Sequence, residues 1–155
     1  NATIPMGATV VQDYIYESML ENADAPIELF HGYTYSGHPV ACAAALATLD
    51  IYKEEGLFEH AGEQAPKIEK AAHSLKGTKH VIDIRNLGVI AAIELEPRGN
   101  AIGARGFEVM KKAWDLGLMV RANGDTLAFS PPLIVSDAQI DEMFTTVKSA
   151  LEQVD

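Results

Sequence analysis

The sequence has little cysteine: Cys42 is the single thiol among 155 residues. One thiol cannot form a disulfide within the chain, which is typical of proteins in a reducing compartment. Cys42 lies in an alanine-rich stretch, HPVACAAALATL, and free cysteine is among the residue types most often buried. We expect a small buried side chain here and not a catalytic thiol, because nothing near it in the sequence marks a partner base.

Long apolar runs and an excess of positive charge are also missing. No apolar run reaches the roughly 18 residues that a bilayer span requires, and the first residues, NATIPMG, do not resemble a secretory signal. Twelve Lys and Arg face 22 Asp and Glu, for a formal net charge of -10. Such an acidic surface repels phosphate backbones. These absences predict a cytoplasmic protein with neither a membrane nor a nucleic acid as partner.

What is present fits a folded domain, although the first forty residues do not form one by themselves. An apolar strand is predicted over residues 6–11 and a short helix over 13–21, before a loop, HGYTYSGHP, that is rich in glycine, aromatic and hydroxyl residues. Pro39 suits the first turn of the next helix, which Gly56 ends. One strand and one short helix bury too little surface for a core, so this region is expected to be part of something larger.

The pattern of apolar residues from about residue 57 onward predicts a complete small domain. A helix that buries Ile68, Ala72 and Leu75 should end near Gly77. Two strands follow, HVIDIRN and GVIAAIELE, and the nearly continuous apolar run of the second predicts burial on both faces.

The remaining elements are another helix, a hairpin and a last helix. Phe107, Met110 and Trp114 are expected to mark the inward face of the first of these. Asn123-Gly124 predicts a tight turn between the strands LMVRA and TLAFS. The S-x-x-Q pattern at Ser136 predicts a capping box for the final helix. The fold class is therefore α+β.

Three segments resemble one family in order and separation. They are TIPMGA near the start, HGYTYSGHPVACAAAL over residues 31–46, and LMVRANGDTLAFSPPL over residues 118–133. Together they resemble the C-terminal part of class III aminotransferases, which are fold-type I enzymes that use pyridoxal 5'-phosphate (PLP). The likeness covers essentially the whole chain and is strongest to the ω-amino acid:pyruvate branch, which includes β-alanine:pyruvate aminotransferase.

The resemblance implies a cofactor contact at Thr34. In the family, the matching threonine reaches across a dimer interface to the phosphate of the neighbouring subunit's PLP, which implies a homodimer or a higher assembly. The residue types fit, because a phosphate is bound by hydroxyl and backbone N–H donors beside glycines. Tyr33 is expected to line the same pocket.

The resemblance implies a substrate contact at Arg121. The matching arginine of the family binds the carboxylate of an amino or keto acid and swings aside for substrates that have none. A planar guanidinium suits this role because it donates two parallel hydrogen bonds to a carboxylate. By sequence alone, Arg121 is also compatible with an ordinary surface arginine at a strand end.

No lysine in the chain matches the Schiff-base lysine of the family, which by the family's spacing lies a few residues before Asn1. No catalytic residue is therefore assigned. Residues 1–56 are expected to form the end of the large PLP-binding domain and an interdomain helix, and residues 57–155 the C-terminal small domain. The implied reaction moves an amino group from an ω-amino acid or amine to pyruvate, and the chain by itself is expected to be inactive.

Two alternatives stay open at this point. One is another class III enzyme, such as a 4-aminobutyrate, ornithine or diaminopelargonate transaminase. The other is a non-catalytic α+β interaction module, which the absent lysine keeps possible.

Several other polar residues are expected to be structural. His31 and His38 lie in one loop without partners at a metal-ligand spacing, so no metal site is predicted. Asp83 and Glu94 are expected to support strands. Three arginines carry no motif and are expected to be solvated, namely Arg85, Arg98 and Arg105.

Overall fold

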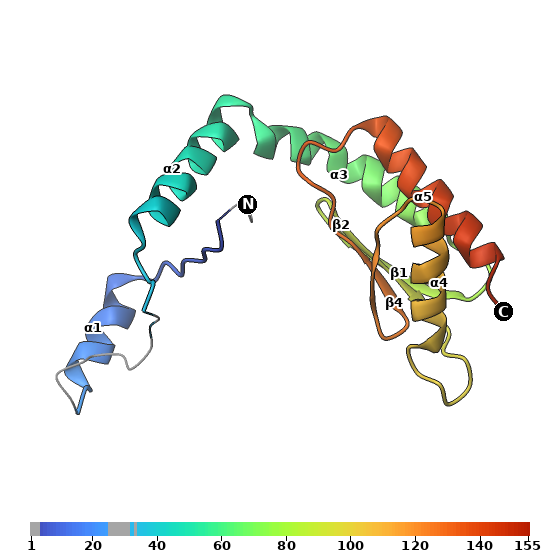
Figure 1. Ribbon diagram of the computed structural model, residues 1–155, viewed down its shortest axis with the longest axis horizontal. Helices are drawn as coiled ribbons and strands as arrows, with labels where there is room; N and C mark the ends of the chain where they lie inside the picture. Colours follow the sequence, from blue (N-terminus) through green and yellow to red (C-terminus); the bar gives the residue numbers. More distant parts are fainter. Residues whose placement is uncertain (1–3, 25–31, 33) are drawn as a thin grey trace. The chain divides into compact units, whose positions relative to one another are not determined.

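The computed structural model describes residues 4–24, 32 and 34–155. The chain divides into two compact units, Asn1–Glu54 and Glu55–Asp155. In Figure 1 the first unit runs from blue to teal and the second from green to red. No helix in the described residues is both long enough and apolar enough to cross a bilayer.

The first unit contains two helices, α1 (Asp13–Glu21) and α2 (Pro39–Glu54). The expected helix at residues 13–21 and the expected place of Pro39 in a first helical turn are confirmed. The expected strand over residues 6–11 is wrong, because this segment is extended without strand pairing. A strand needs a neighbour for its hydrogen bonds, and the described part of this unit offers none.

The described residues of the first unit form no core of their own. Ala41 is the one buried side chain among its described residues. The apolar stripe of α2 is exposed, with Val40 at 59%, Leu46 at 63% and Leu49 at 60% of full exposure. Such a helix gains little stability from burial, which agrees with the expectation that this region belongs to a larger structure.

The second unit is a four-stranded antiparallel sheet with three helices. Its elements in chain order are α3 (Leu57–His73), β1 (Val81–Leu87), β2 (Ile90–Leu95), α4 (Ala104–Asp115), β3 (Arg121–Asn123), β4 (Thr126–Phe129) and α5 (Asp137–Glu152). The strand order is β1-β2-β4-β3. Helix α3 packs on β1 and β2, α4 packs on β3 and β4, and α5 packs against both helices. This architecture confirms the α+β class.

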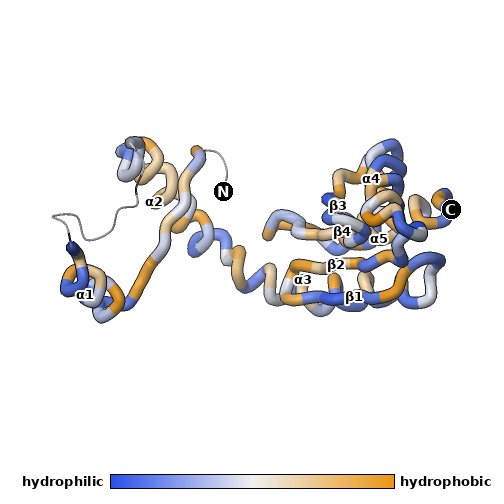
Figure 2. The backbone as a smooth tube through the Cα atoms, turned by 90° about the horizontal axis from the view of Figure 1, so that it is seen from below, coloured by the Kyte–Doolittle hydropathy of each residue, from blue (hydrophilic) through white to orange (hydrophobic). Residues whose placement is uncertain are grey.

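The core lies between the sheet and the helices. Ile93 of β2, Leu127 of β4 and Ile68 of α3 are fully buried in it. Phe129 and Phe144 bring β4 and α5 together with ring centroids 5.0 Å apart. Figure 2 shows β2 mainly in the hydrophobic colours. The predicted capping box is confirmed, since Ser136 and Gln139 exchange hydrogen bonds at the start of α5.

The prediction that β2 is buried on both faces was wrong. Strand β2 buries Ala91, Ile93 and Leu95 on one face only, because the helices cover one side of the sheet and the alternate residues are partly or fully exposed. A register irregularity between Val81 and Asp83 leaves Ile82 56% exposed.

The inward face of α4 also differs from the prediction. It is formed by Arg105, Gly106, Val109 and Ala113, whereas Trp114 is 65% exposed. Phe107 is 53% exposed as well, whereas Met110 packs partly against the core as expected. Small residues are inside because α4 lies close to the sheet.

Arg105 is buried, at 7% of full exposure, and not solvated as expected. Its guanidinium donates to the carbonyls of Glu96 and Asp155, and Arg98 donates to the same Asp155 carbonyl at 2.6 Å. His80 lies against the Val154 carbonyl. Desolvation, followed by the charge of Arg105, lowers the pKa of His80. The basic residues of this corner therefore bind backbone oxygens of the last two residues.

Candidate functional site

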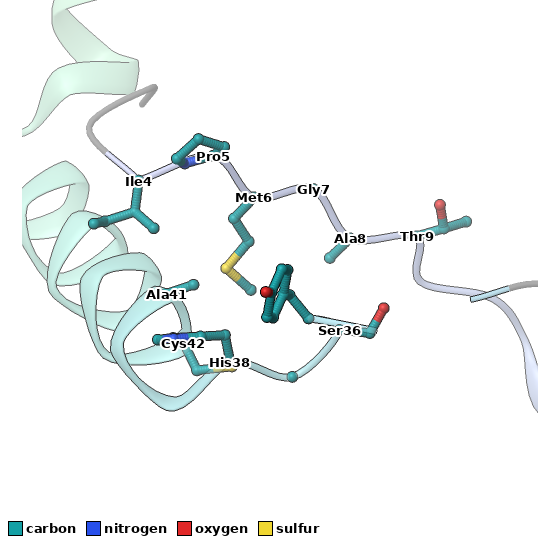
Figure 3. Close-up of a pocket in the computed structure, with 12 residues that line it drawn as sticks. Ile4, Pro5, Met6, Gly7, Ala8, Thr9, Ser36, His38, Ala41 and Cys42 are labelled. Carbon is teal, nitrogen blue, oxygen red and sulfur yellow. The ribbon is translucent and has the colours of Figure 1, made fainter. Parts of the chain in front are cut away.

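Two of the three resembling segments meet in an open pocket of about 770 Å³ in the first unit. The extended segment Ile4–Thr9 forms one wall, and the turn before α2 forms the other. Figure 3 shows Met6 pointing from the extended segment toward this turn, and Ala41 and Cys42 on the first turn of α2. Segments about thirty residues apart in the sequence therefore line one cavity.

Thr34 lies at the start of the turn that leads into α2, and it is exposed. The N–H of His38 closes this turn by donating to the Tyr35 carbonyl at 3.2 Å. Gly37 has a φ of +72°, a left-handed conformation that glycine adopts without strain. A Cβ built at Gly37 would meet no atom within 4 Å, so the turn offers open space beside its hydroxyl groups.

The first turn of α2 is capped from within the loop. Pro39 has no N–H to satisfy, and the Val40 N–H donates to Nδ1 of His38 at 3.2 Å. His38 is therefore a helix-capping residue at the pocket edge, in line with the structural role expected for it. His31 and Tyr33 lie outside the described residues, so the predicted contact of Tyr33 stays a prediction.

Cys42 is half-buried and lines the pocket, whereas a fully buried side chain was expected. The reason is the missing core of the first unit, which leaves α2 largely uncovered. In the described part of the chain, His, Cys, Asp and Glu side chains form no cluster of three or more that could hold a metal ion.

Arg121 is the first residue of β3 in the second unit, and it is exposed. It pairs with Ala128 of β4 across the ladder. Because the strand order places β3 at an edge of the sheet, Arg121 has a sheet neighbour on one side only. The predicted hairpin is confirmed, with Gly124 at a φ of +59° in its turn.

The guanidinium of Arg121 has no hydrogen-bonded or ion-pair partner among the described residues, which separates it from the other three arginines. Arg85 contacts both Asp83 and Glu94. The hydrogen bond to Glu94, followed by that to Asp83, raises the pKa of Arg85. Arg98 contacts Glu108 at 2.7 Å, and Arg105 binds carbonyls. Of the four, Arg121 is the one whose guanidinium donors are unpaired among the described residues.

Asp125 was missed by the sequence reasoning, although it lies inside the third resembling segment. It is buried at 7% of full exposure and accepts hydrogen bonds from backbone N–H groups of Gly103 and Gly106. No local pattern in the sequence signalled these contacts, because both partners lie about twenty residues earlier in the chain.

The family match agrees with these features. The model of the family described as "Aminotransferase class-III" matches residues 2–151 of the chain. The chain is 52% identical to an omega-aminotransferase of Caulobacter vibrioides over 155 residues, which is 100% of this chain and 35% of that protein. It is 43% identical to a beta-alanine--pyruvate aminotransferase of Pseudomonas aeruginosa, over 99% of this chain and 35% of that protein.

Solved structures give the same result. A structure described as a transaminase with L-alanine superposes with a TM-score of 0.81 at 32% identity, over 92% of this chain and 35% of that one. The adenosylmethionine-8-amino-7-oxononanoate aminotransferase of Methanocaldococcus jannaschii superposes with a TM-score of 0.74 at 30% identity, over 82% of this chain and 30% of that one.

The chain belongs to the class III aminotransferase family. Enzymes of this family are PLP-dependent aminotransferases. The chain spans about a third of the length of the curated relatives named above.

Proposed function

We propose that the chain is part of a PLP-dependent aminotransferase that transfers an amino group from an ω-amino acid or amine to pyruvate. The observation that carries the proposal is Arg121, an exposed arginine without an internal partner in a segment that resembles the carboxylate-binding stretch of the family. The fragment forms parts of the cofactor pocket and the substrate pocket, and the reaction belongs to the whole protein.

Thr34 and the turn around it fit one side of a phosphate site. The threonine offers a hydroxyl donor, and the glycines on either side of it leave room for a phosphate. When bound, PLP supplies the electron sink for amino-group transfer. Thr34 would hold its phosphate and so fix its position. We further propose that this contact is made to a neighbouring subunit's cofactor in a homodimer or larger assembly.

Arg121 would bind the carboxylate of the amino or keto acid. Its fork of N–H donors matches the two carboxylate oxygens, and the pair orients the substrate for reaction. Because no internal ion pair holds the guanidinium among the described residues, it can also turn away from a substrate that has no carboxylate. This freedom supports a single pocket for amino acids, amines and pyruvate.

The names of the relatives favour the pyruvate-linked branch. Two relatives named for pyruvate are 43% identical to the chain and a third is 38% identical, whereas one named as a probable gamma-aminobutyrate transaminase is 32% identical. The described region also offers one unpaired arginine, which suits a keto acid with one carboxylate. A dicarboxylic acceptor would need a second cation from elsewhere.

The test is acceptor kinetics on the full-length enzyme. With β-alanine as donor, kcat/KM for pyruvate is expected to exceed that for 2-oxoglutarate by about tenfold or more, because the second carboxylate of 2-oxoglutarate would be left without a partner. A preference for 2-oxoglutarate, or for ornithine or 4-aminobutyrate with such an acceptor, would assign the protein to another class III activity.

The 155-residue chain alone is expected not to transaminate. Its lysines lie in the second unit or near its boundary, none of them lines the pocket beside the Thr34 turn, and none lies in a resembling segment; they are Lys53, Lys67, Lys70, Lys76, Lys79, Lys111, Lys112 and Lys148. Incubation with PLP, borohydride reduction and peptide mass spectrometry should find no stoichiometric adduct at a particular lysine. One dominant modified lysine would contradict this expectation.

A further inference from the structure

Asp125 binds the start of α4 with both oxygens of its carboxylate. The Gly103 N–H donates to Oδ2 at 2.6 Å, and the Gly106 N–H donates to Oδ1 at 2.9 Å. Gly103 is the residue at the N-cap position and has no side chain that could fill this role. An aspartate far along the chain therefore satisfies N–H groups that a local cap normally satisfies, and its charge is stabilised by the helix dipole.

The same residue also joins the hairpin to the rest of the sheet. The Asp125 carbonyl accepts from the Leu95 N–H of β2 at 2.9 Å. On the helix side the backbones are in contact, since a Cβ on Gly106 would lie 2.3 Å from the Gly124 oxygen. The turn between β3 and β4 is thus held by β2 on one side and by α4 on the other.

This arrangement matters for Arg121 because β3 pairs with one strand only, and its remaining support is the packing of Val120 and Ala122 in the core beside α4. The strand has three residues, lies at the sheet edge and pairs only with β4. Arg121 and Asp125 are four residues apart in one hairpin. The backbone position from which the guanidinium extends therefore depends on how firmly the turn is fixed.

We propose that Asp125 is a positioning residue: by holding the β3–β4 turn against the first turn of α4, it fixes the backbone of Arg121 for carboxylate binding. The inference rests on the proposed role of Arg121 as the carboxylate-binding residue. Asp125 itself is buried and touches no substrate in this role.

The experiment compares two half-reactions of the full-length enzyme carrying Asp125→Asn. The substitution preserves shape, but the amide has a single acceptor oxygen and must place its NH2 against one of the two N–H donors. The ratio of kcat/KM for pyruvate to kcat/KM for an amine donor without a carboxylate is expected to fall about tenfold, because a displaced arginine weakens the one interaction that only the carboxylate substrate makes. A purely structural role would lower both values together.

Two variants make the outcome unambiguous. Asp115→Asn makes the same chemical change at the exposed end of α4 and should leave the ratio unchanged. Arg121→Met reports on the proposed function itself. If Arg121→Met lowers the ratio and Asp125→Asn does not, the positioning role is wrong and the function stands. If neither lowers it, both proposals fail.

A second substitution covers the case in which Asp125→Asn does not fold. Asp125→Glu keeps the charge and both acceptors but moves them by one methylene, so the two N–H groups cannot both be reached without a shift of the turn. A lower ratio in this variant supports the positioning role. A folded Asp125→Glu enzyme with the ratio of the unaltered protein overturns it.

Discussion

Replacing Gly106 by alanine is expected to lower the free energy of unfolding of the second unit by about 3 kcal/mol. The added methyl would lie 2.3 Å from the Gly124 oxygen and 2.9 Å from Cα of Asp125. Both are backbone atoms, so no side-chain rotation relieves the clash. Helix α4 must move away from the turn, which breaks the hydrogen bonds of Asp125 and loosens the packing of Val109 and Ala113.

Gly62→Ala is the matched control, measured by urea unfolding of the 155-residue chain. Gly62 lies inside helix α3, where a Cβ would meet no atom within 4 Å. Alanine is favoured over glycine in a helix interior by about 1 kcal/mol, so this variant should be slightly more stable. Equal urea midpoints for the two variants would show that α4 and the hairpin are not in the described contact.

Replacing Arg121 by methionine is expected to lower kcat/KM for pyruvate about 100-fold in the full-length enzyme. Two charge-assisted hydrogen bonds to a carboxylate contribute about 3 kcal/mol together, and each 1.4 kcal/mol corresponds to a factor of ten. An amine donor without a carboxylate makes no such contact, so its kcat/KM should stay within about threefold. Steady-state kinetics of the two half-reactions measure both values.

Arg85→Met controls for the loss of an exposed arginine from the same sheet. Arg85 lies on β1 at the opposite edge and contacts Asp83 and Glu94, so its removal should leave both half-reactions unchanged. Arg121→Lys keeps the charge without the planar fork and should fall between the unaltered enzyme and Arg121→Met. If Arg121→Met and Arg85→Met behave alike, Arg121 does not bind the carboxylate.

The elements that the sequence predicted well are those with strong local signals. The hairpin at Asn123-Gly124 and the capping box at Ser136 depend on a few adjacent residues, and both are confirmed. The buried face of α5 shows the same local control, because Ile140, Phe144, Val147 and Leu151 form one apolar stripe at helical spacing.

The failures share a different cause, which is that burial depends on distant neighbours. Phe107 and Trp114 of α4 were expected to face inward but are exposed, because the close approach of Gly106 to Gly124 favours small residues on the inner face. Strand β2 was expected to be buried on both faces. Its apolar run does not indicate that the helices of the second unit all pack on one face of the sheet. The segment 6–11 has strand-like residues without a partner strand.

For the candidate site, sequence resemblance pointed to Thr34 and Arg121, and the structure adds what surrounds them. That Arg121 has no internal partner among the described residues could not be predicted, because it depends on where the acidic residues of other elements lie. The role of Asp125 was hidden for the same reason, since its partners at Gly103 and Gly106 lie about twenty residues earlier in the chain.

The strand order of the second unit has a consequence for how it folds. Strands β1 and β2 are joined by a tight turn, and so are β3 and β4, so each pair can set its register through short-range contacts soon after synthesis. The β2–β4 ladder is the long-range step, because residues 96–125 must first close into a loop that contains α4. The two hairpins are therefore expected to form first and to pair with each other late in folding. The turn at Asp125 bonds to both β2 and α4, so its hydrogen bonds can form only when this pairing is complete.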